Sequence, residues 1–463
     1  MNRELNERGV KLIMSEASYS RALDMVYVEY MIAEILSRIE EEGISLRAAM
    51  EDYFKVKRIR DSNLKRLMRA FALGVLRNFR KADLLGELVV GKHKYWELSS
   101  YTRNLLRATL YELKYRNISV DRVLTILSKV DRVKVNRANL LHVKTVSLED
   151  LIKEIPRTER LSVKYSQPVW IVEYLIKLLG YEEAIKLLKR FNRPSTMWLR
   201  VNTLLIKRSE LIKKLRRRGV LVEEDRDLDD LIKVVKYKRP LASLPEYQKG
   251  YFYIQDKASA LVSHVLNPSV KEKILDLCAA PGSKTTHLAQ LSQDKAIVVA
   301  SDWSFKRSLI LKSSCERLRI ESVLGVVSDS RILPLRSNLQ FDKVLVDPDC
   351  SSLGRLGHSP EVRLWVKPRI VEELSKLQYQ LLNVAIGIAR RRGIIVYSTC
   401  TLTLEENELL IKRVIDERED VELLETEPKI GINGFLKMKK AQRLFPHTHD
   451  TLGFFIAKLV KVK

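Results

Sequence analysis

The segment Ile274 to Leu291, ILDLCAAPGSKTTHLAQL, constrains the fold more than any other stretch of the chain. It begins with an apolar run that is too short for a helix, which predicts a buried strand. Small and turn-forming residues follow, and they let backbone N–H groups approach a ligand closely. From Lys284 onward the apolar spacing is helical. A strand, a glycine-containing turn and a helix start favour a nucleotide-type ligand site, although an ordinary strand–turn–helix connection has the same outline.

Strand and helix patterns alternate downstream of Gln255, which is typical of a doubly wound parallel sheet. We therefore predict a Rossmann-like α/β domain over residues 256–463. Its strands are expected at Ile274–Leu277, Ile297–Ser301, Gly325–Val327, Phe341–Val346, Gly393–Ser398 and Gly453–Lys458.

Two further parts precede this domain, so the chain is predicted to be multidomain. Residues 1–150 carry apolar residues at helical spacing almost throughout and predict an all-α domain. Residues 145–160 read as a linker. Residues 161–255 mix short helices and strands, which predicts a small α+β unit, and its basic composition suits substrate handling.

The charge balance favours a polyanionic partner. The 463 residues include 83 Lys and Arg against 58 Asp and Glu, a net charge of +25. Nucleic acid is the first candidate for such a partner, and a solvated charged surface, as in some heat-stable proteins, is the alternative. Several of the basic residues cluster around the middle helix of the first domain: Arg58, Arg60, Lys65, Arg66, Arg69, Arg77 and Arg80.

The four cysteines form no C-x-x-C pair, so we expect no zinc ribbon and no metal site. So few cysteines in so long a chain favour reduced thiols and a cytoplasmic location. The first ten residues, MNRELNERGV, lack the apolar core of a signal peptide, and no apolar run reaches membrane-spanning length. We expect a cytoplasmic monomer without a membrane partner.

Three aspartates stand at the carboxyl ends of successive predicted strands. Asp302 is placed to accept both ribose hydroxyl hydrogens of a nucleotide-type ligand, and Asp329 can reach an adenine edge. Asp347 ends the fourth strand. A loop or helix cap explains any one of them alone, but three in register indicate a ligand crevice.

Two cysteines follow strands at the same edge, Cys350 in DPDCSSLG and Cys400 in STCT. A buried structural role suits Cys315, which falls in mid-helix, and partly suits Cys278, but it suits these two poorly. A thiolate beside a basic group such as Lys284 would be an activated nucleophile because its pKa is lowered.

These segments together resemble the NOL1/NOP2/Sun family of RNA cytosine-5 methyltransferases. The matching stretches are DLCAAPGSKTTHLA, SDWSFKR, SDSR, VDPDCSSLG, YSTCTLTLEENE and FPHTHDTLGFFIAKL, preceded by YSQPVW, LRVNTL and YIQDKAS. NLKRLMRAFALGVLRN and TRNLLRATLYEL resemble a NusB-type helical RNA-binding domain. The overall layout is similar to RsmB-type rRNA methyltransferases.

The resemblance implies an S-adenosylmethionine-dependent enzyme that methylates cytosine C5 in rRNA or tRNA. It assigns attack on cytosine C6 to Cys400 and assistance in release to Cys350, a choice that spacing alone leaves open. It places Asp347 and Lys284 against the cytosine ring. The implied cofactor contacts are Cys278, Ala279, Ala280, Pro281, Gly282, Ser283, Lys284, Asp302, Asp329 and Asp347.

Two residues depart from the family pattern: Ser283 replaces a common second glycine, and Asp349 replaces proline before the first cysteine. We expect Ser283 to be harmless, whereas the charge of Asp349 should disfavour the Cys350 thiolate.

Two other classes of protein are the alternatives. A non-catalytic RNA-binding factor that retains the cofactor fold would not need two cysteines at strand ends with intact cofactor carboxylates. A small-molecule methyltransferase would leave the basic N-terminal part unexplained.

Overall fold

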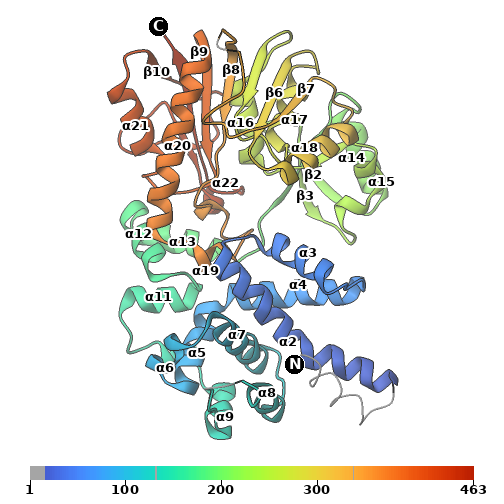
Figure 1. The fold of residues 1–463 in the computed structure, drawn as a ribbon, viewed down its shortest axis with the longest axis vertical. Helices are drawn as coiled ribbons and strands as arrows, with labels where there is room; N and C mark the ends of the chain where they lie inside the picture. The colour runs from blue at the N-terminus through green and yellow to red at the C-terminus, as the bar shows by residue number, and fades with distance from the viewer. Residues whose placement is uncertain (1–15, 131–132, 337) are drawn as a thin grey trace. The chain divides into compact units, whose positions relative to one another are not determined.

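The structure, a computed structural model, describes residues 16–130, 133–336 and 338–463 (Figure 1). The first ten residues, on which the absence of a signal peptide was predicted, lie outside this range, as does the start of the predicted helical domain. The chain packs into two compact units, one up to Asn192 with Ser359–Trp365, the other Arg193–His358 with Val366–Lys463. The division at 1–150, 161–255 and 256–463 stays a prediction. None of the described helices is long and apolar enough to cross a membrane.

The first unit is helical in all of its described elements, which confirms the predicted all-α N-terminal region. Two short helices, α10 and α11, lie where a linker was expected. The helices are α2 (Glu16–Glu42), α3 (Leu46–Val56), α4 (Ser62–Arg77), α5 (Phe79–Val90), α6 (Lys92–Glu97), α7 (Ser100–Tyr115), α8 (Val120–Leu127), α9 (Arg137–Thr145), α10 (Leu148–Leu151), α11 (Arg157–Tyr165), α12 (Val169–Leu179), α13 (Tyr181–Phe191) and α19 (Val362–Trp365).

A buried ion network holds α2, α5 and α7 together. Arg107 Nε donates to Asp83 Oδ1 at 2.7 Å, and Arg107 Nη1 donates to Glu40 Oε2 at 2.9 Å. Tyr95 Oη completes the shell of Asp83 at 2.6 Å. Asp83 and Arg107 are almost wholly buried, so removing one partner would leave an uncompensated charge, at a cost of about 3–5 kcal/mol.

The second unit begins with a small antiparallel sheet in the order β2-β3-β1-β4. Its members are β1 (Met197–Val201), β2 (Leu221–Glu224), β3 (Leu231–Lys236) and β4 (Phe252–Ile254), with α14 (Arg208–Arg217), η1 (Leu241–Ser243) and α15 (Pro245–Gln248). Side chains alternate along β1. Leu199 and Val201 pack with α14, whereas Trp198 packs into the core of the large sheet's domain. The small sheet therefore shares a core with the domain that follows.

The large sheet runs parallel from β7 through β6, β5 and β8 to β9. On the far side of β9 the next strand is β13, which pairs with β9 in the antiparallel sense. The strands are β5 (Lys273–Asp276), β6 (Ile297–Asp302), β7 (Val323–Val327), β8 (Phe341–Val346), β9 (Ala389–Thr399), β10 (Val421–Leu424), β11 (Ile432–Asn433), β12 (Gln442–Leu444) and β13 (Phe454–Lys461). The six predicted strands are present, but the expectation of an entirely parallel sheet was wrong at its C-terminal edge.

Helices cover both faces of this sheet, which explains the nearly continuous apolar strands. Ile274 packs toward α16 (Lys257–Leu266), α17 (Ser283–Leu291) and α18 (Phe305–Leu318). Its neighbour Leu275 packs toward α20 (Pro368–Ile388) and α21 (Glu408–Glu417) on the opposite face. The carboxyl ends of β5, β6, β8 and β9 thus lie along one edge, as in a Rossmann-like domain. The remaining short helices are η2 (Leu353–Arg355) and α22 (Pro446–His449).

Candidate active site

The turn between β5 and α17 is pinned to the neighbouring strand β6. Ala279 N donates to Ser301 O at 2.9 Å, and Ala280 N donates to Asp302 Oδ2 at 3.0 Å. Gly282 has φ +104°, and a Cβ atom there would lie 2.5 Å from Leu311 Cδ1. The turn therefore requires glycine at this position, both for its backbone conformation and for its packing against α18.

Asp302 and Asp329 line one pocket of about 320 Å³ beside this turn. Asp302 is 3% exposed and its other oxygen accepts from Ser304 N at 2.9 Å. Asp329 is held by Arg331, whose Nη2 lies 2.6 Å from Oδ2, and these hydrogen bonds lower the pKa of Asp329. The lining residues are Leu277, Cys278, Asp302, Trp303, Arg307, Asp329, Ser330, Arg331, Asp349, Leu377 and Leu381.

The chemistry of this lining fits a nucleoside. The pocket volume lies within the range of small-ligand sites, and its mixture of apolar side chains with a few polar groups is typical of them. The Asp302 carboxylate has remaining lone pairs for ribose hydroxyls, and the apolar side chains offer a surface for a base. The structure thus places Cys278, Asp302 and Asp329 around one pocket, and their role as cofactor contacts stays a prediction.

A second group lies at the ends of β8 and β9. Lys284 Nζ donates to Asp347 Oδ2 at 2.7 Å, and Ser398 Oγ donates to Asp347 Oδ1 at 2.6 Å. Lys284 is buried and its Nζ lies 5.2 Å from the centroid of the Phe454 ring. Lys284 is on α17 and Asp347 follows β8, so two separate strand–helix units bring an ammonium group and a carboxylate into contact.

The two strand-end cysteines meet there. Cys350 Sγ and Cys400 Sγ are 3.1 Å apart, and Ser352 Oγ lies 3.6 Å from Cys400 Sγ. The hydrogen bond from Cys350, the positive charge of Arg355 and the hydrogen bond from Ser352 lower the pKa of Cys400 to about 7 despite its burial. The contact with Cys400, burial and the negative charge of Glu406 raise the pKa of Cys350 well above that of a free thiol. Cys400 is therefore the better thiolate.

The charge of Asp349 was expected to act on the neighbouring Cys350 thiol, but the Asp349 carboxylate faces Arg307 instead. Its carboxylate lies 3.5 Å from Arg307 Nη1 and is 56% exposed. Its charge contributes to the raised pKa of Cys278, after burial and Asp276. The raised pKa of Cys350 has the predicted direction, but Cys400, burial and Glu406 cause it rather than Asp349.

Sequence reasoning gave no role to Glu406, a fully buried carboxylate that connects the two cysteine loops. It accepts hydrogen bonds from Ser351 N at 2.8 Å, Thr403 Oγ1 at 2.7 Å and Gln378 Nε2 at 2.9 Å. Ser351 follows Cys350, and Thr403 lies shortly after Cys400. The acidic run LEENE after the second cysteine was the one sequence feature that pointed to Glu406. Once buried, a carboxylate needs several hydrogen-bond donors, and the two cysteine loops supply them.

Gly354 fixes the distance between the same loops. Gly354 N donates to Cys400 O at 3.0 Å, and Gly453 N donates to Gly354 O at 2.9 Å. A Cβ atom at Gly354 would lie 2.1 Å from Gly453 O and 2.7 Å from Cys400 O. Only glycine allows the backbones to approach this closely.

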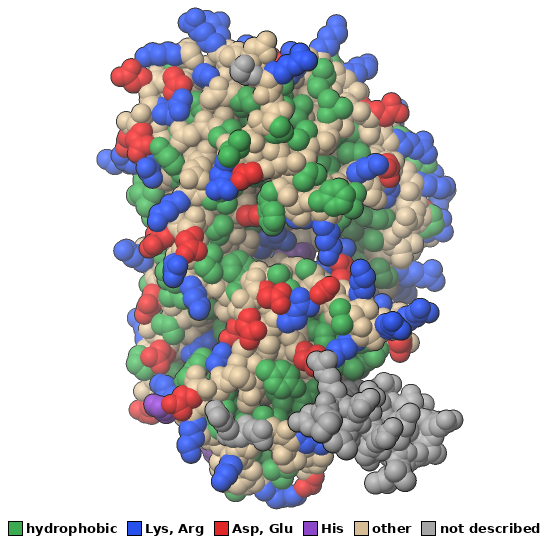
Figure 2. Space-filling model, viewed as in Figure 1, with side chains coloured by type: hydrophobic (Ala, Val, Ile, Leu, Met, Phe, Trp, Pro, Cys, Tyr) green, Lys and Arg blue, Asp and Glu red, His purple; other side chains and the backbone are tan. Residues whose placement is uncertain are grey.

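A basic hollow of about 750 Å³ lies on the first unit, between α3 and α4. Five of the seven clustered basic residues line it, whereas Arg80 binds the buried Asp83 instead. Its lining is Arg47, Met50, Glu51, Phe54, Lys55, Arg58, Ile59, Arg60, Lys65, Arg66 and Arg69. Figure 2 shows Lys and Arg side chains interspersed with Asp and Glu over one face of the molecule. Among the described residues that line the basic hollow, Glu51 is the single acidic one, and it is already paired with Arg47.

The fold and the strand-end site define a Rossmann-like methyltransferase, and comparison with known proteins agrees. A family model described as 16S rRNA methyltransferase RsmB/F matches residues 263–460, and a ferredoxin-like domain model of RsmF/B-like methyltransferases matches residues 167–239. Neither model reaches the first helices, so their NusB-like character stays a prediction.

Full-length relatives share the whole layout. A probable ribosomal RNA small subunit methyltransferase B from Synechocystis is 30% identical over 86% of this chain and 91% of its own length. A Bacillus subtilis protein of the same description is 28% identical over 92% of this chain and 97% of its own length. The crystal structure of PH0851 superposes with a TM-score of 0.75 at 28% identity, over 94% of this chain and 99% of that one.

The chain therefore belongs to the RsmB/F family of methyltransferases. The predicted resemblance to RNA cytosine-5 methyltransferases of the NOL1/NOP2/Sun type is confirmed.

The thiol pair predicts a pH-dependent reactivity that labelling can follow. Alkylation of Cys400 by iodoacetamide, read from its peptide by mass spectrometry, should fall as pH drops through about 7, because the reactive thiolate is protonated. In Cys350→Ala the midpoint should move up toward the value of a free thiol, about 8.5, because the donor is lost. Cys350→Ser keeps a donor and should shift less. Cys315→Ala, on α18, is the matched control and should leave the midpoint unchanged; an equal midpoint in Cys350→Ala would contradict the assignment.

Proposed function

We propose that the chain transfers a methyl group from S-adenosylmethionine to C5 of a cytosine in RNA through a covalent Cys400–C6 adduct. The observation that carries the proposal is the 3.1 Å contact of Cys400 with Cys350 beside the Lys284–Asp347 pair. This group lies at the strand edge that also forms the Asp302 pocket. Cofactor contacts are proposed at residues 278–284, Asp302, Asp329 and Asp347.

Cytosine C5 is too weak a nucleophile to accept a methyl group unaided. A bond from Cys400 Sγ to C6 gives C5 the character of an enamine carbon. The cofactor, when bound, supplies the electrophilic methyl group. Asp347 and Lys284 contact the ring, and Asp347 favours protonation at N3. Afterwards a base removes the C5 proton, the C6–S bond breaks, and the electron pair returns to Cys400. We assign assistance of this release to Cys350, and the target base must be unstacked to reach the thiols.

Ribosomal RNA is the substrate class we propose. The relatives that match both the helical first unit and the catalytic domain are described as ribosomal RNA small subunit methyltransferases. Transfer RNA is the second candidate. A tRNA (cytosine(72)-C(5))-methyltransferase from Pyrococcus horikoshii is 39% identical, but the match spans 52% of this chain and 61% of that protein. The solved NSun6 structure from the same organism covers 64% of this chain, with a TM-score of 0.59.

Bisulfite sequencing of RNA from a deletion strain separates the two substrates. We expect one cytosine of the small-subunit rRNA to lose its methyl mark and to regain it when the wild-type gene, but not the Cys400→Ala variant, is restored. Loss of a mark from tRNA alone would contradict the rRNA assignment while keeping the enzyme class.

The two cysteines should fail differently. Cys400→Ala should abolish both methyl transfer and any RNA adduct, because no thiolate attacks C6. The Cys350→Ala variant should still attack C6 and transfer the methyl group, but it should release the RNA slowly. A protein–RNA species that survives denaturing electrophoresis should therefore accumulate. Cys315→Ala serves as the control and should turn over normally. An adduct in Cys400→Ala and none in Cys350→Ala would show that the roles are reversed.

The basic hollow of the first unit is where we propose that RNA phosphates bind. Arg58, Arg60, Arg66 and Arg69 are exposed, and no ion pair to a carboxylate is found for them within the described residues. Unpaired guanidinium groups bind phosphate oxygens without first breaking a protein ion pair, and each phosphate contact releases counterions.

Charge reversal tests this surface. The double variant Arg66→Glu/Arg69→Glu should weaken RNA binding and reduce the slope of log K against log salt by about 1 for each lost contact. Lys92→Glu/Lys94→Glu on α6 reverses two exposed charges of the same unit and is the matched control. Equal losses of affinity in both variants would mean that the effect comes from net charge rather than from the basic hollow.

A further inference from the structure

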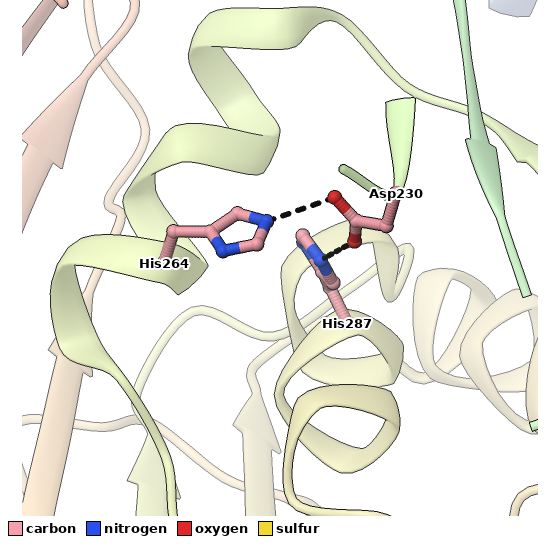
Figure 3. Close-up of side chains that lie close together, drawn as sticks. All are labelled: Asp230, His264 and His287. Carbon is pink, nitrogen blue, oxygen red and sulfur yellow. Dashed lines mark hydrogen bonds and ion pairs between the residues drawn. The ribbon is translucent and has the colours of Figure 1, made fainter. Parts of the chain in front are cut away.

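A buried carboxylate of the small sheet binds two helices of the methyltransferase domain. Asp230 immediately precedes β3, and its Oδ1 lies 2.9 Å from His264 Nε2 on α16 while its Oδ2 lies 2.7 Å from His287 Nε2 on α17 (Figure 3). Gln290, also on α17, donates to Oδ2 at 3.3 Å. We call Asp230, His264 and His287 the Asp230 triad. His287 is fully buried and Asp230 is 5% exposed.

The geometry of the triad is that of hydrogen bonds rather than of a metal centre. The Nε2 atom of each ring faces a different oxygen of the Asp230 carboxylate, at a distance normal for a ring N–H that donates to a carboxylate. Burial lowers the pKa of His287 to about 3, so its ring is a neutral donor. The positive charge of Arg200 acts on both His287 and Asp230, which disfavours a divalent cation at this point.

Arg200 binds the same helix from the central strand of the small sheet. This side chain is 1% exposed. Its Nη1 donates to Ser283 O at 2.6 Å and its Nη2 donates to Thr286 Oγ1 at 3.0 Å. Both acceptors lie in the first turn of α17. Arg200 Nη1 also donates to Gln255 Oε1 at 2.5 Å. A buried guanidinium that donates two hydrogen bonds to a helix start fixes that start in position.

The segment so fixed is part of the proposed cofactor site. The first turn of α17 follows directly on the Cys278–Gly282 loop and carries Lys284, the partner of Asp347. Neither Arg200 nor Asp230 lines the cofactor pocket. Any effect they have on the cofactor must therefore act through the position of α17.

We propose that Arg200 and Asp230 are positioning residues that hold α17, so that the small sheet sets the affinity for S-adenosylmethionine as well as contributing to RNA handling. This inference rests on the proposed function, because it takes the loop before α17 as the cofactor-binding loop. The small sheet is then a structural support of the cofactor site that cannot be removed without loss of cofactor binding.

Calorimetry with S-adenosylmethionine on the full chain tests the inference. Asp230→Ala leaves the buried ring N–H of His287 and the partly exposed ring N–H of His264 without an acceptor, and it should raise the Kd for the cofactor roughly tenfold or more. Arg200→Lys keeps the charge but loses the fork geometry, and should raise it severalfold. The matched control is Asp229→Ala, because the Asp229 side chain is exposed and faces Arg208 rather than α16 or α17, and this variant should bind the cofactor as the wild type does. In steady-state kinetics the KM for cofactor should rise while the KM for RNA stays within about twofold.

Each outcome decides a separate point. If Asp230→Ala does not fold, Arg200→Lys and His264→Gln, at a partly exposed ring, carry the test. Wild-type affinity for cofactor in folded variants would overturn the positioning role, as would a rise in the KM for RNA alone. If the purified wild type held one divalent metal ion per chain and the His264→Gln variant did not, the Asp230 triad would be a metal site, and the positioning role by hydrogen bonds would be overturned. Failure of the wild type itself to bind S-adenosylmethionine would instead refute the proposed function.

Discussion

The parallel pairing of β8 with β9 sets the geometry on which the rest of the site depends. Val346 pairs with Tyr397, so Asp347, just past the end of β8, lies beside Ser398 near the end of β9. The loops that follow place Cys350 and Cys400 in contact. No residue of either loop could bring the thiols together if the strands ran in opposite directions, because their carboxyl ends would then lie at opposite edges of the sheet.

Two chemically identical thiols acquire different reactivity from their surroundings. Arg355 and Ser352 favour a charged Cys400, whereas Glu406 disfavours a charged Cys350. A shared proton between them lowers one pKa and raises the other, as expected for a coupled pair. Glu406 therefore has two effects: its hydrogen bonds hold both loops, and its charge adds to the contact with Cys400 and to burial in raising the pKa of Cys350.

The sequence predicted those features that depend on local pattern. Apolar runs identified β5, β6 and β8, and polar residues at their ends identified the crevice, because parallel strands bring their ends together. Features set by long-range packing were not predictable. The antiparallel β13 has the same apolar pattern as a parallel strand, and Asp349 gave no sign that Arg307 would be its partner. Asp230 and Glu406 received no role from the sequence, since burial is a property of the folded chain.

Trapping the intermediate tests the central claim, that Cys400 is the nucleophile. RNA containing 5-fluorocytosine offers no C5 proton to remove, so the adduct should persist after methyl transfer. The account predicts that mass spectrometry finds the methylated base attached to the peptide that contains Cys400. Attachment to the Cys350 peptide, or methylated RNA with no attached protein, would contradict it.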